Sequence, residues 1–168
     1  MKITLKGNPI STVGEAPKVG AAAPTFTATG QDLSAKSLGD YKGKVVILSA
    51  VPSLDTPVCD ISTKRFNEEV GKMPGAVCLT ISGDLPMAQK RWCGAAGVSN
   101  VVTLSTFRDK SFGQAYGLTI AEGALKELLA RCVVVIDKTG VVRHVEVVPE
   151  IAQEPNYASA LAAAKAAS

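Results

Sequence analysis

The stretch KVVILSAV, residues 44–51, restricts the possible folds of this chain more than any other segment. It is a nearly continuous apolar and β-branched run, without the apolar–polar alternation of a strand that has one face in water. Such a run predicts a strand buried on both faces, which requires further structure above and below the sheet. This run and the similar CVVVI at 132–136 are far too short to span a bilayer.

Strand and helix patterns alternate along the rest of the chain. A β-hairpin is expected at 1–14, with its turn at Gly7-Asn8-Pro9. Further strands are expected within 75–82, 100–105 and 131–148, the last as two strands joined by a Lys-Thr-Gly turn. Helices are expected over 57–72, over 84–97 with Asp84 as its cap, over 109–117 and in the Ala-rich tail 154–168. The first helix should direct Ile61, Phe66, Val70 and Met73 inward, and the tail helix Tyr157, Ala158, Leu161, Ala162 and Lys165.

This order of elements predicts an α/β fold in which a mixed sheet carries helices on its faces. The 168 residues suit a single domain over 1–168, and no linker or internal repeat interrupts them. The net charge of +3 comes from 18 basic and 15 acidic residues that are intermixed, which argues against a nucleic-acid or membrane-surface partner. No segment resembles a signal peptide, so a soluble, cytoplasmic protein is expected.

Cys59 is placed differently from an ordinary packing cysteine. Thr56 is a good helix N-cap and Pro57 a good first helical residue, so Cys59 falls in the first turn. Free N–H groups and the positive dipole end favour an anion there, and the thiolate is the nucleophilic form of a cysteine. Asp55 and Asp60 oppose this charge, so a cation should approach from elsewhere in the chain. Position alone leaves packing and chemistry both open.

The other three cysteines and the single histidine help to decide which kind of site Cys59 could form. The chain has no C-x-x-C motif, and its single histidine, His144, has no ligand partner at a zinc-site spacing, so neither a thioredoxin-type dithiol nor a metal site is expected. Cys78 and Cys132 lie within apolar strand runs and are expected to be inert. Cys93 lies late in a helix and directly precedes Gly94, which weakens that helix end and lets the thiol move.

Pro52, Thr56 and Cys59 reproduce the P-x-x-x-T-x-x-C signature of peroxiredoxins. The segments PSLDTPVCD, DLPMAQKRWCG, STFRD, AYG, RCVVVID and PEIAQEPNY are similar to those of the thiol peroxidase subfamily, an atypical two-cysteine group. The resemblance covers nearly the whole chain, and it implies a thioredoxin-like fold with an added N-terminal β-hairpin.

The resemblance also implies the roles of five residues. Cys59 would be the peroxidatic cysteine and Cys93 the resolving one, and the two would join in an intramolecular disulfide. Thr56 would hold the thiolate and the peroxide, Pro52 would shield the pocket from water, and Arg131 would supply the distant cation. No metal, flavin or other cofactor would be needed.

The implied activity is the reduction of hydrogen peroxide and organic hydroperoxides to water and alcohols. Cys59 would pass through a sulfenic acid, and thioredoxin would reopen the disulfide in a homodimeric enzyme. Two alternative functions are compatible with the same sequence. One is a peroxide sensor that hands its disulfide to a specific partner, and the other is a thioredoxin-fold binding module with structural cysteines.

Overall fold

In the computed structural model, which describes residues 1–168, the run at 44–51 forms strand β5 (Val45–Ala50), and every residue of β5 is buried. β5 lies inside a seven-stranded mixed sheet of order β4-β3-β7-β6-β5-β8-β9. β5, β6 and β7 run parallel, whereas β8, β9, β3 and β4 are joined by antiparallel pairings. The other strands are β3 (Thr27–Thr29), β4 (Ala35–Ser37), β6 (Ala76–Ser82), β7 (Val101–Ser105), β8 (Cys132–Ile136) and β9 (Val142–Val147).

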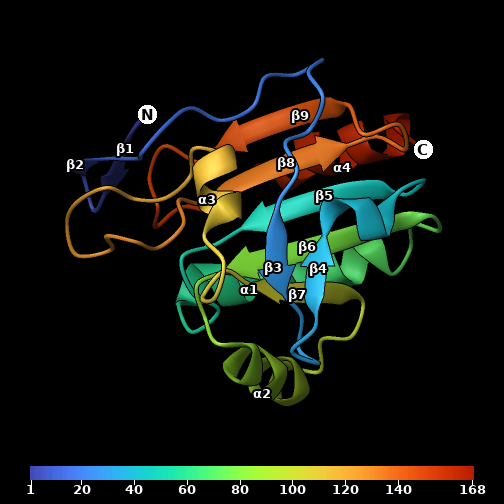
Figure 1. Ribbon diagram of the computed structural model, residues 1–168, viewed down its shortest axis with the longest axis horizontal. Coiled ribbons are helices and arrows are strands. Elements are labelled where there is room, and N and C mark those ends of the chain that lie inside the picture. Colours follow the sequence, from blue (N-terminus) through green and yellow to red (C-terminus); the bar gives the residue numbers. More distant parts are fainter.

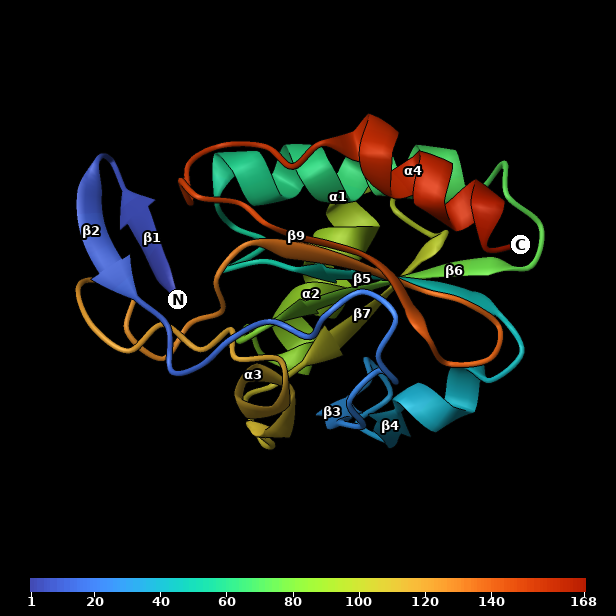
Figure 2. The same ribbon diagram turned by 90° about the horizontal axis from the view of Figure 1, so that it is seen from above.

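Both faces of the sheet are covered, which explains the composition of β5 (Figures 1 and 2). Helices α1 (Pro57–Val70) and α4 (Tyr157–Ala166) lie on one face, and α2 (Pro86–Ala96) packs against β7. Val45 and Ile47 join the apolar cluster under these helices. Val46 and Leu48 join the cluster on the opposite face, where α3 (Ser111–Ala115) lies. The predicted α/β fold with a central mixed sheet is therefore confirmed.

The predicted N-terminal hairpin is also present, as β1 (Lys2–Leu5) and β2 (Asn8–Ser11), and it projects from one side of the molecule (Figure 2). It is fastened to the chain beyond β9, where the Thr4 N–H donates to the Pro149 carbonyl at 2.7 Å. The Glu150 carboxylate accepts hydrogen bonds from the amides of Gly7 and Lys6, both at 3.0 Å. Hydrogen bonds from Gly7, Ala152 and Thr4 lower the pKa of Glu150 to about 2.

The inward face of α1 is as predicted at Phe66, Val70 and Met73, which packs against the apolar cluster, but not at Ile61. Ile61 is half exposed, at 50%, while the buried positions are Cys59, Ser62, Thr63, Phe66 and Val70. A helix turns by about 100° per residue, so Ile61 lies on the side opposite Cys59. The helix ends at Val70 and not at 72.

The tail helix is rotated as well. Tyr157, Ala160 and Ala164 are buried, whereas Ala158, Ala162 and Lys165 are exposed and Leu161 is half buried, so the predicted inward face was wrong except at Tyr157 and Leu161. The polar stretch before β5 holds two elements that were not predicted, β4 and a 3-10 turn at Leu38–Tyr41. None of the helices combines the length and apolar character that crossing a bilayer demands.

Asp84 is not the cap of α2. The N-cap position belongs to Leu85, with Pro86 as the first helical residue, so Asp84 lies one residue too early to cap the helix. Its carboxylate points instead toward the loop between β5 and α1.

Candidate active site

Four of the five predicted site residues, Pro52, Thr56, Cys59 and Arg131, converge where the three parallel strands end. The chain passes directly from β5 into the loop 51–56 and then into α1, which carries Cys59. β6 and β7 end beside it at Ser82 and Ser105, and β8, which runs antiparallel to β5, begins there at Cys132, directly after Arg131. The carboxyl ends of parallel strands are a common location for ligand sites in α/β sheets.

Cys59 lies at the third helical position of α1 and is fully buried. Thr56 is the N-cap residue, as predicted, but its hydroxyl makes no capping hydrogen bond to a backbone amide. It lies 2.7 Å from the Cys59 sulfur instead. The first backbone hydrogen bond of the helix joins the Asp60 amide to the Thr56 carbonyl, so the amides of the first turn remain free near the sulfur.

Arg131 is the cation that the sequence requires. Its guanidinium Nη2 donates to the Cys59 sulfur at 3.3 Å and to the Ile151 carbonyl at 2.9 Å, and Nε donates to the same carbonyl at 3.0 Å. Arg131 is only 2% exposed, and its Nη1 is buried without a hydrogen-bond partner. A buried guanidinium with an unused donor can accommodate a further oxygen atom beside the sulfur.

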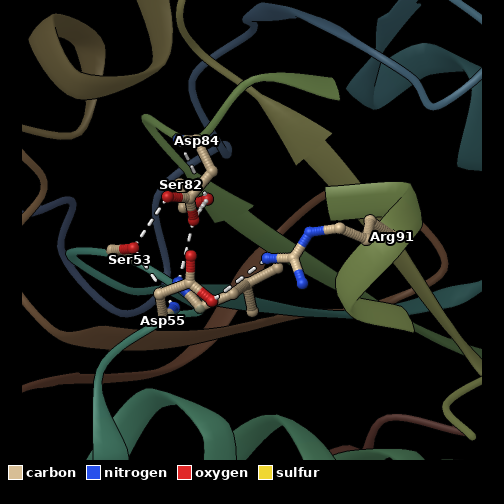
Figure 3. Close-up of polar contacts among 6 residues, drawn as sticks. Ser53, Asp55, Ser82, Asp84 and Arg91 are labelled. Atoms are coloured by element: carbon tan, nitrogen blue, oxygen red, sulfur yellow. Dashed lines mark hydrogen bonds and ion pairs between the residues drawn. The ribbon is translucent and has the colours of Figure 1, made fainter. Parts of the chain in front are cut away.

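The two acidic neighbours of Cys59 are paired elsewhere. Asp60 lies 2.8 Å from the Lys64 ammonium group on the exposed side of α1. Asp55 lies 3.7 Å from Arg91 of α2 (Figure 3), and both side chains are exposed. Their charges are therefore partly compensated by surface cations and screened by water.

A pocket of about 330 Å³ lies against the Thr56 and Arg131 side chains that contact the sulfur. The loop before α1 contributes Pro52, which is itself buried, and the first turn of α1 contributes Pro57 and Val58. The remaining wall is mainly apolar and comes from the hairpin and two distant segments: Leu5, Lys6, Leu125, Leu128, Ile151 and Ala152. Lys6 and Arg131 are its only charged side chains, and both are cationic.

Cys93 lies in the last turn of α2 and is buried, with 7% exposure. The Gln31 side-chain amide donates to its sulfur at 3.4 Å, and the Thr103 hydroxyl lies 3.9 Å away. Burial raises the pKa of the Cys93 thiol, partly offset by these contacts with Thr103 and Gln31. Cys59 and Cys93 share one apolar cluster, and all four cysteines are free thiols.

Comparison with known proteins places this site in a family. The family profile described as Redoxin matches residues 18–161. A "Thiol peroxidase" of Leptospira interrogans is 56% identical over 168 residues, which is 99% of this chain and 98% of that one. The "Thiol peroxidase" of Bacillus subtilis is 52% identical over 165 residues, covering 98% and 97% of the two chains. The solved structure of a "peroxiredoxin-like protein from Aquifex aeolicus" has a TM-score of 0.94 at 45% identity and covers 99% of this chain and 97% of that one.

The chain belongs to the peroxiredoxin family. It is an enzyme of the thiol peroxidase type, and its P-x-x-x-T-x-x-C residues lie at the converging point described above. In this peroxiredoxin Pro52, Thr56 and Arg131 line one pocket, and the buried Cys59 sulfur lies behind them, against Thr56 and Arg131. Cys93 lies apart and contacts Gln31.

The two strand thiols of this peroxiredoxin lie in the sheet, as predicted. Cys78 is in β6 and Cys132 in β8, with exposures of 0% and 1%. Burial raises the pKa of Cys78 to about 12 and also raises the pKa of Cys132, where the charge of Glu146 adds to the effect. Both stay protonated at neutral pH and are poor nucleophiles. No group of three or more His, Cys, Asp or Glu side chains is arranged to hold a metal ion.

Sequence reasoning missed one polar residue of this region, Gln31, and assigned another, Asp84, the wrong role. Gln31, in the turn between β3 and β4, contacts Cys93 across 62 positions of sequence, and no local pattern marks it. Asp84 follows β6 directly, and the parallel pairing of β5 with β6 places it beside the loop that leads to Cys59. That pairing was the signal that could have identified Asp84.

Proposed function

We propose that this peroxiredoxin reduces hydroperoxides through Cys59 as the peroxidatic thiol. The Cys59 thiolate attacks one oxygen of the peroxide, the O–O bond breaks, and the sulfur becomes a sulfenic acid. The departing oxygen takes a proton and leaves as water or as an alcohol. The observation that carries this proposal is the convergence of Thr56 Oγ1 at 2.7 Å and Arg131 Nη2 at 3.3 Å on the buried Cys59 sulfur.

These donors suit both the thiolate and the transition state. Negative charge moves from sulfur to the departing oxygen during the reaction, and fixed donors stabilise such developing charge best where water is excluded. Arg131 lines the pocket, holds one donor on the sulfur and keeps a second donor, the buried Nη1, without a partner, so its guanidinium still has a hydrogen bond to offer a peroxide oxygen. The free amides of the first turn of α1 supply further donors. Buried Pro52 closes the pocket toward the sheet and keeps water from the sulfur.

The size and apolar wall of the pocket suit organic hydroperoxides as well as hydrogen peroxide. Its volume of about 330 Å³ is within the usual range for small-molecule sites, and leucine and isoleucine side chains form much of its wall. An alkyl group can bury its surface against Leu5, Leu125 and Leu128 while its peroxide group reaches Arg131.

Resolution is assigned to Cys93. Its thiol displaces water from the Cys59 sulfenic acid and forms an intramolecular disulfide. Cys93 is covered by Gln31 in the reduced protein, so this step requires the last turn of α2 to leave its place. The position suits such a motion, since Gly94 and Gly97 weaken the end of that helix and Gly97 already has a left-handed backbone, with φ of 66°.

Thioredoxin is the proposed reductant and would reopen the disulfide by thiol–disulfide exchange. The proposed location is the cytoplasm, where thiols are kept reduced. A homodimer is proposed from family resemblance.

A coupled assay tests the proposal. Oxidation of NADPH is followed with thioredoxin, thioredoxin reductase and hydrogen peroxide or an alkyl hydroperoxide. Wild type should turn over both peroxides, Cys59→Ser neither, and Cys93→Ser should react once and stop at the sulfenic acid. Turnover by Cys59→Ser would remove Cys59 from its role, and turnover by Cys93→Ser would remove the intramolecular disulfide.

A further inference from the structure

Asp84 is the centre of a hydrogen-bond network between the segments that carry the two cysteines (Figure 3). Its Oδ1 accepts from the Ser53 hydroxyl at 2.7 Å. Its Oδ2 accepts from the Leu54 amide at 2.8 Å and from the Ser82 hydroxyl at 2.7 Å. No lysine or arginine pairs with this carboxylate, so neutral donors alone hold it. A half-buried carboxylate that is satisfied in this way fixes the groups that donate to it.

On one side the network reaches Cys59. The Ser53 carbonyl accepts from the Thr56 amide at 3.2 Å and lies 3.0 Å from the Thr56 hydroxyl. That hydroxyl also lies 2.7 Å from the Cys59 sulfur, yet it has one proton to give. With a thiol, Cys59 donates to Thr56 Oγ1, and Thr56 donates to the Ser53 carbonyl. When Cys59 is a thiolate, the Thr56 hydroxyl donates to the sulfur instead. The Ser53 carbonyl then still accepts a hydrogen bond from the Thr56 amide.

On the other side the network reaches α2. The Ser82 hydroxyl accepts from the buried Gln89 side chain at 3.0 Å, and Gln89 also donates to the Leu104 carbonyl at 3.0 Å. The Ser105 hydroxyl donates to the Asp84 backbone carbonyl at 2.5 Å. Asp84 is therefore anchored to the ends of β6 and β7, which makes it a rigid support for the loop at 53–54.

We propose that Asp84 is a positioning residue for peroxide reduction. It holds Ser53 and Leu54 in place, so that the Thr56 hydroxyl can turn its hydrogen bond from the Ser53 carbonyl to the Cys59 sulfur. This inference rests on the proposed role of Cys59. Asp84 touches neither the sulfur nor the pocket, and it acts only through Ser53, Leu54 and Thr56.

The variants Asp84→Ala and Asp84→Asn form a matched pair, because both remove the same charge and only the second keeps an acceptor for Leu54 and Ser82. The rate of Cys59 oxidation by hydrogen peroxide should fall about tenfold or more in Asp84→Ala and stay within about threefold of wild type in Asp84→Asn. Arg91→Gln is the control, since it breaks the exposed Asp55 pair between the same two segments, and it should stay within about twofold.

A second readout separates positioning from charge. In Asp84→Ala the pH midpoint for alkylation of Cys59 should move upward, because Thr56 no longer presents its hydroxyl to the thiolate. Loss of a negative charge alone would move it downward. If Asp84→Ala does not fold, as judged by circular dichroism, Ser53→Ala takes its place and should slow oxidation by about threefold or more.

Each contrary outcome has one meaning. Equal rates for Asp84→Ala and Asp84→Asn, or a downward midpoint in Asp84→Ala, overturn the positioning role. Where Ser53→Ala is the variant used, a wild-type rate does the same. Cys59→Ser is measured in parallel: if it reduces peroxide at the wild-type rate, the proposed function fails, whereas an inactive Cys59→Ser beside a fully active Asp84→Ala defeats only the role of Asp84.

Discussion

Cys59 and Cys78 are equally buried, at 0% exposure each, yet their surroundings differ completely. Cys78 lies in β6 between Ile47 of β5 and Val101 of β7, and burial raises its pKa to about 12. Cys59 lies at a helix start, where a hydroxyl and a guanidinium both point at the sulfur. Burial therefore does not separate a packing thiol from a candidate nucleophile in this protein. The donors around the sulfur do.

The two regions also differ in how freely they can change. Cys78 belongs to a central strand with hydrogen-bonded neighbours on both sides, so moving it would break the sheet. Cys59 and Cys93 lie near the ends of helices, where one turn can open without unfolding the domain. The proposed disulfide between Cys59 and Cys93 requires that freedom.

The largest effect is expected from removing the Cys59 thiol. Cys59→Ser should reduce peroxidase activity to background and keep the fold, because serine retains the size of the side chain and lacks the nucleophilic sulfur. Cys78→Ala is the matched control and should remain active with a small loss of stability. Peroxidase rates and thermal melts of both variants check this. An inactive but folded Cys78→Ala would show that Cys78 is also needed for activity and is not only a packing thiol.

Arg131→Met should slow peroxide reduction by about ten- to a hundredfold, because hydrogen bonds from a charged donor contribute about 1.5–3 kcal/mol. It should also move the pH profile of Cys59 alkylation to higher pH, since the thiolate loses its cation. Arg143→Met, which removes an exposed arginine of β9, serves as the control. An unchanged alkylation profile in Arg131→Met would exclude Arg131 from the site.

Thr56→Val should slow the reaction by about tenfold through the loss of one hydrogen bond to the sulfur, with nearly the same shape retained. Thr56→Ser keeps the hydroxyl and should preserve most of the rate. Stopped-flow oxidation with hydrogen peroxide measures both. If serine and valine behave alike, the methyl group and packing matter at this position, and the hydroxyl does not.

The smallest effect concerns the wall of the pocket. The pKa of Glu150 is lowered to about 2 from an ordinary 4.5, so its stabilising contribution is present above pH 4.5 and disappears as the pH falls toward 2. Glu150→Gln should lower the free energy of unfolding at pH 7 and loosen the hairpin that places Leu5 and Lys6 at the pocket. Glu68→Gln, on the exposed side of α1, is the control.

Urea unfolding of Glu150→Gln and wild type at several pH values makes this test. The difference between them should shrink between pH 4.5 and 2. A difference that stays constant over that range would show that the carboxylate is not what fastens the hairpin.

The sequence predicted the sheet well because β5, β6 and β8 are buried on both faces, and only apolar residues tolerate that position. It predicted the inward face of α1 except at Ile61, and that of α4 mostly wrongly. The inward stripe of α1 contains Ser62 and Thr63, and α4 is mostly alanine, so neither helix has the contrast of polarity that reveals its orientation.

The residues of the candidate site also fall into those that the sequence could identify and those that it could not. Cys59, Thr56 and Pro52 lie close together in sequence, and a motif identifies them. The need for a cation could be argued from Asp55 and Asp60, although only the resemblance pointed to Arg131. The contacts of Gln31 and Asp84 could not be predicted, because they depend on which strands are neighbours in the sheet.

The proposed disulfide is tested by peptide mapping of the wild-type protein after one equivalent of hydrogen peroxide, with free thiols blocked at the moment of quenching. A dominant disulfide between Cys59 and Cys93 within one chain is expected, with Cys78 and Cys132 recovered as blocked thiols. A dominant linkage of Cys59 to Cys78 or Cys132, a bond between two chains, or an unoxidised Cys59 would contradict it.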